Sequence, residues 1–372
     1  MRHNLASEFR FPRPELAQEM VVSLSGRQKW NSDADGLFLS APRRTGKSTY
    51  LRNDLKPALE ADGVEVIYLD LWANLQLDPT EQVYAAVSKA LKAHGLRHAA
   101  GSSLTDAFRL LIAEGRRVAL IIDEAQHLLV SERGDDVTRE LKAARDTLNS
   151  PGDVHLMLVM SGSDRDKLGR LTNSKSAAFY GSRVRAMPLL DRDYIDWMCG
   201  LLAASIPSLG QINAEGLLKT FQSLGNRPRD MDMAISNALN PRLAGGLAFE
   251  EAVADHANEI VAAQRTRYRD TYLALTDIQR AVLDHLMTVG DAFTPFGAAA
   301  HQAYASHLGR KPGTPAIQKA LNAMREMRPP LVWKSNWGEY ALEDLGMMAW
   351  HDSEVAAGAW PPVESVDTDT AG

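Results

Sequence analysis

The sequence has few of the features that mark secreted or membrane proteins. Cys199 is the single cysteine among 372 residues, so an internal disulfide is excluded. No apolar run approaches the ~20 residues that a membrane helix needs. Residues 1–16 carry charges and prolines where a signal peptide needs an unbroken apolar segment. We therefore expect a soluble, cytoplasmic protein with no membrane partner.

Basic residues are also in deficit, with 41 Lys and Arg against 47 Asp and Glu and a net charge of −6. This balance argues against a protein that coats nucleic acid with its whole surface, but it permits a basic patch on one domain. Hydrophobic residues at 45% and charged residues at 24% are typical of a globular protein. A single core stops growing at roughly 250–300 residues. The length therefore predicts two or three domains.

Short apolar runs alternate with helical patterns in the first half of the chain. The runs at 36–40, 64–72, 117–124 and 154–163 are rich in Val, Ile and Leu without polar alternation. That pattern is typical of strands covered on both faces, and helix-length segments between such strands indicate the crossovers of a parallel sheet. We therefore predict an α/β core with a parallel sheet over residues 1–190.

After Pro188 the strand pattern stops, and apolar residues recur at three- and four-residue spacing, which predicts an α-helical lid domain over 191–268. Residues 269–351 contain three more helical patterns and then a hairpin pattern, an order typical of a winged helix. In the third of these helices we expect Thr314 at the N-cap and Pro315 at the first helical position. Residues 352–372 are acidic and aperiodic, which predicts a disordered tail.

The segment APRRTGKST, residues 41–49, stands between the first predicted strand and a predicted helix. A phosphate loop needs this context, because its backbone amides and the helix N-terminus bind the anion. Gly46 lets the backbone approach a phosphate, Lys47 reaches the β- and γ-phosphate oxygens, and the Ser48 hydroxyl can ligate Mg²⁺. The predicted ATP contacts are Ala41, Pro42, Arg43, Arg44, Thr45, Gly46, Lys47, Ser48 and Thr49.

Two features of this loop leave alternatives open. Ala41 stands where such motifs begin with glycine, although Pro42 favours an extended conformation that alanine adopts without strain. Arg43 and Arg44 add cations that would strengthen nucleotide binding, contact a partner or simply face solvent. A basic surface turn is the alternative interpretation of the whole segment.

Two carboxylates, Asp123 and Glu124, follow a run of five apolar residues. They are expected at the carboxyl end of a buried strand, where open α/β sheets bind ligands. We predict that Asp123 holds Mg²⁺ through a coordinated water and that Glu124 orients or deprotonates the water that attacks the γ-phosphate. Solvated acids at a strand end are the alternative, but their occurrence downstream of the lysine loop favours ATP hydrolysis.

These motifs resemble those of the AAA+ P-loop ATPases, and the resemblance covers residues 9–239. APRRTGKST, VIYLDLW, IIDEAQHLL, SGS, FYGSR and GNRPRD occur in the order of that family. The chain is most similar to the prokaryotic branch of archaeal-type ATPases that borders the STAND group, and less similar to transposition-associated ATPases with a DEAQ signature. The resemblance implies that residues 9–20 pack near adenine, that Ser161 or Ser163 is sensor 1, and that Arg229 is the sensor 2 arginine.

The resemblance also implies that the chain forms an oligomer. Arg183 and Arg185 stand where many AAA+ proteins place an arginine that reaches the ATP of a neighbouring subunit, which implies a homo-oligomer. Basic residues in a solvated loop are the alternative. For Ser161, Ser163 and Arg229, the alternatives are a turn serine and a surface ion pair.

The C-terminal domain is locally basic. Between 301 and 340 six cations, Arg310, Lys311, Lys319, Arg325, Arg328 and Lys334, stand against Glu326 and Glu339. A winged helix with this charge would bind duplex DNA through its third helix, where Gln318, Lys319 and Asn322 would face a groove. Trp333 and Trp337 would contact DNA or a partner, or form part of the core. Two functions remain: a DNA-associated ATPase, and a slow nucleotide switch that recruits or restrains a protein partner.

Overall fold

The computed structural model of the chain describes residues 10–28, 30, 32–97, 101–113, 115–163, 165–173, 176–240, 242, 247–334 and 339–363. The chain divides into two compact units, Met1–Val253 and Ala254–Gly372. Each has its own hydrophobic core, as expected for this length. Within the described ranges no helix is long and apolar enough to cross a membrane.

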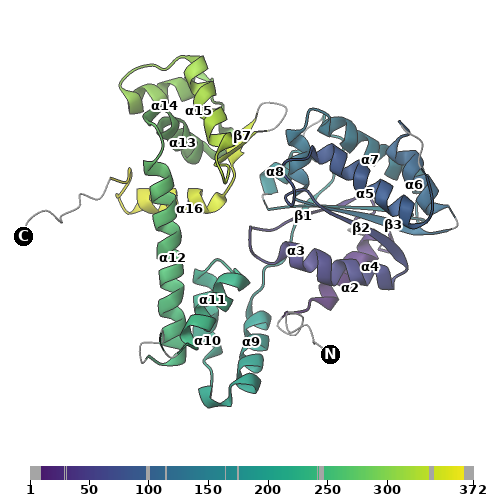
Figure 1. The fold of residues 1–372 in the computed structure, drawn as a ribbon, viewed down its shortest axis with the longest axis horizontal. Coiled ribbons are helices and arrows are strands. Elements are labelled where there is room, and N and C mark those ends of the chain that lie inside the picture. Colours follow the sequence, from purple (N-terminus) through teal and green to yellow (C-terminus); the bar gives the residue numbers. More distant parts are fainter. Residues whose placement is uncertain are drawn as a thin grey trace, which may run out of the picture. The chain divides into compact units, whose positions relative to one another are not determined.

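A five-stranded parallel sheet forms the centre of the first unit (Figure 1). Its strands lie in the order β2-β3-β4-β1-β5, and all neighbouring pairs are parallel. Their bounds are β1 Leu37–Ser40, β2 Val64–Asp70, β3 Arg117–Asp123, β4 Leu156–Gly162 and β5 Val184–Ala186. The predicted parallel α/β core is confirmed, because the four apolar runs supply β1 to β4.

Helices cover both faces of this sheet, which explains why β1, β3 and β4 are apolar almost without interruption. On one face lie α2 (Pro14–Leu24), α3 (Lys47–Tyr50), the π-helical turn η1 (Leu51–Leu55) and α4 (Lys56–Ala61). On the other lie α5 (Pro79–Ala93), α6 (Leu104–Ile112) and α7 (Gly134–Leu148). Successive strand residues point to opposite faces, so Ala119 and Ile121 join the first of these layers.

The edge strand β5 was not among the predicted strands. It has three residues, none of them buried, and only one of them is a β-branched apolar residue. Its pairing with β1, where Phe38 lies opposite Val184 and Ser40 opposite Ala186, makes it a strand. This pairing joins residues more than 140 positions apart, so no local pattern indicates it.

The region after β5 is helical, as predicted. It contains α9 (Arg192–Ser205), the 3₁₀ turn η3 (Pro207–Leu209), α10 (Ala214–Ser223), α11 (Pro228–Ala238) and α12 (Phe249–Leu273). The predicted domain boundary at 268/269 falls inside α12. This helix continues because Tyr268 and Tyr272 pack on the core of the second unit, which gives its last turns an apolar face.

In the second unit three helices and a hairpin follow α12, in the order predicted for a winged helix. The helices are α13 (Asp277–Val289), α14 (Ala298–Leu308) and α15 (Thr314–Glu326), with the 3₁₀ turn η4 (Gly290–Ala292). The hairpin pairs β6 (Val332–Lys334) with β7 (Tyr340–Leu342) in antiparallel register. Gly313, not Thr314, is the N-cap of α15. Trp333 is buried in this unit, and Trp337 lies outside the described residues.

The predicted disordered tail requires a correction at its start. α16 runs from Leu345 to Ala356, past the predicted boundary at 352. Beyond it, the Trp360 ring lies 4.8 Å from that of Tyr272 and 5.3 Å from that of Trp350. Packing of this partly buried aromatic ring stabilises the segment despite its acidic composition. Residues 364–372 lie outside the described part of the chain.

Candidate nucleotide-binding site

The predicted phosphate loop joins β1 to α3 at the carboxyl edge of the sheet. Gly46 has a φ of 94° and Arg44 a φ of 68°, so two left-handed residues turn the loop tightly. The Thr45 hydroxyl donates to the Pro42 carbonyl at 2.7 Å and closes the turn. At the positive φ of Gly46, glycine is the residue that fits at low cost, because it has no Cβ. The loop therefore has the tight backbone that phosphate binding needs.

Ala41 fits the first position of this loop. It is 3% exposed, and its amide donates to the Gly162 carbonyl of β4 at 3.1 Å. The residue thus continues the parallel pairing of β1 with β4, which requires an extended backbone and not a positive φ. The departure from glycine at this position is therefore compatible with the loop.

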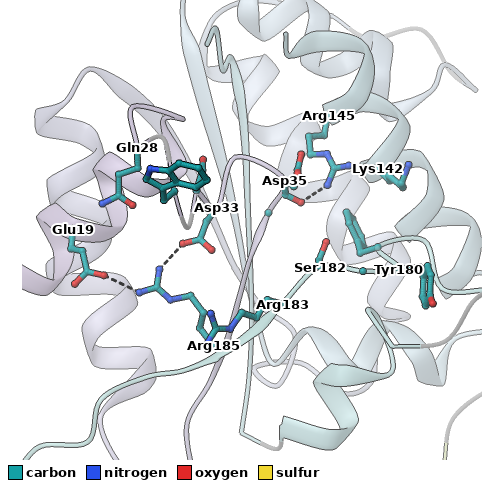
Figure 2. Close-up of a pocket in the computed structure, with 15 residues that line it drawn as sticks. Glu19, Gln28, Asp33, Asp35, Lys142, Arg145, Tyr180, Ser182, Arg183 and Arg185 are labelled. Atoms are coloured by element: carbon teal, nitrogen blue, oxygen red, sulfur yellow. Dashed lines mark hydrogen bonds and ion pairs between the residues drawn. The ribbon is translucent and has the colours of Figure 1, made fainter. Parts of the chain in front are cut away.

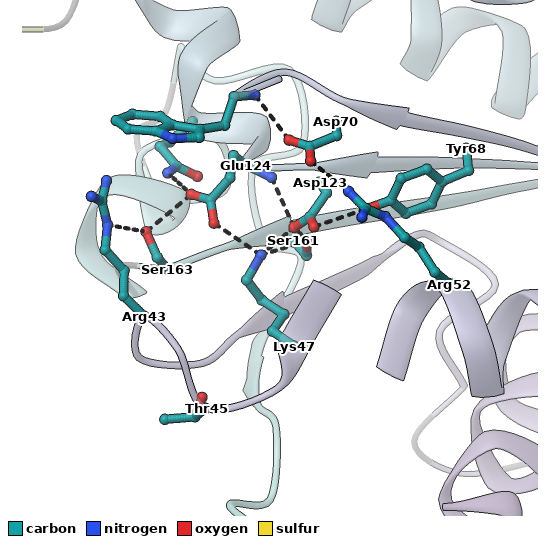
Figure 3. A network of polar contacts seen from close by, with 12 residues as sticks. Arg43, Thr45, Lys47, Arg52, Tyr68, Asp70, Asp123, Glu124, Ser161 and Ser163 are labelled. Atoms are coloured by element: carbon teal, nitrogen blue, oxygen red, sulfur yellow. Dashed lines mark hydrogen bonds and ion pairs between the residues drawn. The ribbon is translucent and has the colours of Figure 1, made fainter. Parts of the chain in front are cut away.

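Lys47 lies at the centre of a buried polar cluster (Figure 3). Its side chain is 5% exposed, and its amino group forms an ion pair with Asp123 and, at 3.0 Å, with Glu124. The same group donates to the Ser161 hydroxyl at 3.3 Å. Strands β3 and β4 and the first turn of α3 bring these four side chains together, although they are up to 114 residues apart.

Asp123 is fully buried at the end of β3 and is held by several donors. The Ser161 hydroxyl donates to it at 2.5 Å and the Tyr68 hydroxyl at 3.0 Å. Burial acts to raise the pKa of Asp123, but the charge of Lys47 and hydrogen bonds from Lys47, Ser161 and Ser48 outweigh it and hold the pKa below the usual range. Asp123 is therefore ionised at neutral pH.

Glu124 has a left-handed backbone, with φ 57° and ψ 42°, which costs a residue with a Cβ about 1–2 kcal/mol. The turn directs its carboxylate toward Lys47. Gln126 donates to one carboxylate oxygen at 2.5 Å and Ser163 donates to the same oxygen at 3.0 Å. Burial acts to raise the pKa of Glu124, but the charge of Lys47 and the Gln126 hydrogen bond lower it overall.

Arg43 extends this cluster to the rim of the loop. Its Nε donates to the Ser163 hydroxyl at 3.4 Å, and its guanidinium lies 4.7 Å from the centre of the Trp72 ring. The Trp72 ring in turn lies 5.1 Å from the His127 ring. Arg43 thus contacts the cluster, whereas Pro42 and Arg44 are exposed on the loop. In α3, Thr49 is exposed and Ser48 is half-buried.

Three residues of this cluster were not predicted from the sequence: Tyr68, Trp72 and Gln126. Tyr68 and Trp72 lie at the carboxyl end of β2, the same sheet edge as the acidic pair. Arg52 donates to Asp70 at 2.6 Å and lies 5.0 Å from the Tyr68 ring, which fixes that end of β2. The signal available in the sequence was their position directly within or after a predicted strand.

Arg183 does not approach this site in its own chain. It precedes β5, which begins beside the second residue of β1, whereas the phosphate loop leaves the other end of β1. Arg183 is exposed beside a hollow of about 830 Å³ that Tyr180 and Lys142 also line (Figure 2). Arg185, by contrast, forms ion pairs with Asp33 at 2.6 Å and Glu19 at 2.9 Å.

Arg229 is exposed at the second position of α11. The turn before this helix is fixed near the phosphate loop, because the Asn226 side chain donates to the Leu190 carbonyl at 2.7 Å. A methyl group placed on Gly46 would lie 3.9 Å from Leu190 Cδ1. The first turn of α11 therefore lies near the phosphate loop. Arg229 itself forms no ion pair with any described residue.

The segment predicted to pack near adenine connects the core to the lid. Arg10 forms an ion pair with Asp54 at 2.8 Å, and the Phe11 ring lies 5.9 Å from that of Tyr194 and 5.7 Å from that of Trp197 in α9. Phe9 lies outside the described residues. The contact with adenine stays a prediction.

The cluster offers the groups that ATP and Mg²⁺ require. Gly46 and the start of α3 present backbone amides, and Lys47 presents a cation. Ser48 and Asp123 supply oxygen ligands, which Mg²⁺ prefers. No sulfur or imidazole ligand lies among these groups. The side chains at this sheet edge therefore fit a nucleotide with its magnesium ion.

Comparisons with known proteins concern the domain family and the fold. A family model described as "AAA domain" matches residues 31–168. No protein of curated function matches the chain. Among solved structures, the chain is similar to the ADP form of the ORC2 protein of Aeropyrum pernix, with 14% identity and a TM-score of 0.52 over 94% of this chain and 95% of that one.

Two further solved structures resemble the chain. One is a Walker-type ATPase of Pyrococcus abyssi, with 15% identity and a TM-score of 0.49 over 91% of this chain and 95% of that one. The other is the Aeropyrum pernix ORC1 protein in complex with DNA, with 18% identity and a TM-score of 0.47 over 94% of each chain. The ORC2 likeness supports the fold. Residues 31–168 thus match a model of the AAA domain, and they lie in a parallel α/β core of the P-loop type.

Proposed function

We propose that the chain binds ATP with Mg²⁺ and hydrolyses it. The observation that carries this proposal is the position of Lys47, which lies buried between Asp123 and Glu124 directly after a tight loop with a left-handed glycine. A surface turn has no reason to bury a lysine against two carboxylates, because desolvation of three charges is costly. A site that exchanges these contacts for phosphate and metal explains the arrangement.

In this proposal each side chain has a separate task. Lys47 transfers its amino group from the carboxylates to the β- and γ-phosphates. Ser48 and Asp123 hold the magnesium ion, which neutralises phosphate charge when bound. Glu124 accepts the proton of the attacking water.

The two sensor 1 candidates occupy different places. Ser161 is fully buried and contacts Asp123 and Lys47, whereas Ser163 contacts Glu124 and Arg43. We propose that Ser161 orients the metal-binding carboxylate. Ser163 lies beside the base, so it is the better candidate for a contact with the γ-phosphate or the attacking water.

The full chain provides the direct test. ATP binding is measured by calorimetry with Mg²⁺ and with excess EDTA, and phosphate release is then followed with and without duplex DNA. We expect Mg²⁺-dependent tightening and measurable turnover. Absence of ATP binding under both conditions contradicts the proposal.

We further propose that Arg183 acts on the ATP of a neighbouring copy and Arg229 on the ATP of its own chain. Arg183 is exposed at the end of the sheet away from its own loop, and an arginine that acts between subunits contributes about 10³-fold or more to turnover. Arg183→Ala and Arg229→Ala should each lower turnover with little change in folding stability. Mass determination in ATP reports the oligomer.

Mixing experiments separate the two arginines. Addition of Glu124→Gln subunits should restore part of the activity of Arg183→Ala, because some sites then combine an intact Glu124 with a neighbour's intact Arg183. The same addition should not rescue Arg229→Ala, whose defect lies in the chain that holds Glu124. Failure to rescue Arg183→Ala would remove Arg183 from the role between subunits.

We propose that the second unit is a winged helix that binds duplex DNA. Lys319 and Asn322 are exposed on α15, and Arg310, Lys311 and Arg328 are exposed beside it. Gln318 is less accessible for a groove, because it donates to Asn322 at 2.9 Å and to the Tyr340 hydroxyl at 3.2 Å. Electrostatic contacts with phosphates therefore carry this proposal.

Lys319→Glu combined with Arg325→Glu, in the full chain, should weaken duplex binding. Each lost phosphate contact lowers the slope of log affinity against log salt by about 0.9. The measurement is fluorescence anisotropy with a labelled duplex at several salt concentrations. Lys92→Glu, at an exposed position of α5 in the first unit, is the control. No binding by the wild-type chain at low salt would favour the nucleotide switch with a protein partner.

A further inference from the structure

Gln126 lies in the 3₁₀ helix η2 (Ala125–Val130), which begins directly after the left-handed Glu124. This turn brings the Gln126 amide back against the Glu124 carboxylate. Its Nε2 donates to Glu124 Oε2 at 2.5 Å, while Lys47 Nζ lies 3.0 Å from the other oxygen, Oε1. Ser163 adds a third donor at 3.0 Å. Both oxygens of the carboxylate are thus fixed.

The Gln126 side chain is 1% exposed, and its amide has only one possible orientation. A carboxylate accepts hydrogen bonds, so the NH₂ group must face Glu124 and the carbonyl oxygen must point away. Among the described residues this oxygen, Oε1, is buried without a hydrogen-bond partner. A buried acceptor left unpaired costs about 1–3 kcal/mol. This cost offsets most of what the hydrogen bond to Glu124 contributes to stability, so the stability of the fold gives little reason for a glutamine at this position.

Gly162 makes room for that orientation. A Cβ atom added at Gly162 would lie 2.6 Å from Gln126 Oε1, closer than real Cβ atoms approach an oxygen. Gly162 is the last residue of β4, and its φ is not positive, so the strand conformation does not require glycine. The close approach of the Gln126 amide explains why glycine occupies position 162.

We propose that Gln126 is a positioning residue, which holds the Glu124 carboxylate in the orientation that activates the attacking water, and that Gly162 provides the space for its amide. This inference rests on the proposed ATP hydrolysis. Gln126 acts only through Glu124 and does not contact the nucleotide. Directing the NH₂ group at the carboxylate leaves the carbonyl oxygen of Gln126 unpaired, which lowers the stability of the fold.

Gln126→Met tests the inference, because methionine has a similar length but no donor. We expect kcat to fall 10- to 100-fold, as for other residues that orient a catalytic group. The Kd for ATP should not change, and the free energy of unfolding should change little, since the loss of the hydrogen bond to Glu124 is offset by removal of the unpaired oxygen. A purely structural glutamine predicts the reverse: lower stability with normal kcat.

A double-mutant cycle with Gly162→Ala gives an independent measurement. In the wild-type background the added methyl group displaces the amide and should lower kcat. In a Gln126→Ala background the amide is absent, so Gly162→Ala should have no further effect on kcat. Additive losses would show that Gly162 acts independently of Gln126 and would overturn this part of the inference.

The results of these experiments distinguish a failure of the positioning role of Gln126 from a failure of the proposed ATP hydrolysis. If Glu124→Gln is inactive while Gln126→Met keeps the wild-type kcat, the positioning role is wrong and ATP hydrolysis stands. If the wild-type chain releases no phosphate from ATP, hydrolysis itself is wrong. A lower kcat for Gln126→Met with unchanged ATP affinity and undiminished stability supports both.

Discussion

Lys47→Ala is expected to abolish ATP binding and also to destabilise the nucleotide-free chain. The lysine contacts phosphates in the bound state, and in the free state it is the cation between two buried carboxylates, Asp123 and Glu124. Removal of one partner from a buried ionic cluster costs about 3–5 kcal/mol because the remaining charges are uncompensated. This variant should therefore lose affinity and folding stability together.

The stability loss should depend on pH. In the wild type, the pKa values of Asp123 and Glu124 are lower in the folded than in the unfolded chain. These carboxylates therefore stabilise the fold at pH values above their unfolded pKa values. The contribution is lost as the pH falls through the folded pKa values. Without Lys47 both carboxyl groups are buried beside each other, so their pKa values should rise and ionisation should destabilise the variant. The difference in unfolding free energy should thus grow from acid to neutral pH.

Urea unfolding at several pH values and ATP titration of the same samples check both parts. Lys56→Ala is a matched control on α4, because Lys56 is a half-exposed lysine with an i,i+4 partner, Glu60, at 2.9 Å. It should change neither property appreciably. Wild-type stability in Lys47→Ala would show that the buried cluster is not present in solution.

Glu124→Gln should retain ATP binding and lose hydrolysis. The amide has the shape of the carboxylate and still accepts a hydrogen bond from Gln126, but it takes no proton from water. Loss of a general base lowers turnover by about 10²–10⁴-fold. ATP affinity should stay within a few-fold of wild type, because the carboxylate acts on the water and not on the bound phosphates.

Single-turnover phosphate release and equilibrium ATP binding measure the two quantities separately. Glu81→Gln, at an exposed position in the first turn of α5, controls for the loss of one negative charge. Normal turnover in Glu124→Gln removes this residue from the catalytic role. A simultaneous loss of ATP affinity would indicate that Glu124 mainly holds the site together.

The sequence by itself determined the local parts of this protein. The runs that become β1 to β4 are apolar because helices cover both faces of the sheet, so their pattern was visible without the fold. The GKS segment and the acidic pair could be placed at strand ends by their immediate neighbours. Lys47, Asp123 and Ser161 lie together in the structure, because the carboxyl ends of parallel strands share one edge of the sheet. Their catalytic roles stay predictions.

Tertiary structure decided what depends on residues distant in sequence. β5 is a strand only through its pairing with β1, and Trp360 packs on rings that belong to α12 and α16. Arg185 differs from Arg183 because Asp33 and Glu19 lie beside it. Gln126 gains its partner through the left-handed turn at Glu124, a backbone conformation that glutamate rarely adopts and that no sequence pattern predicts.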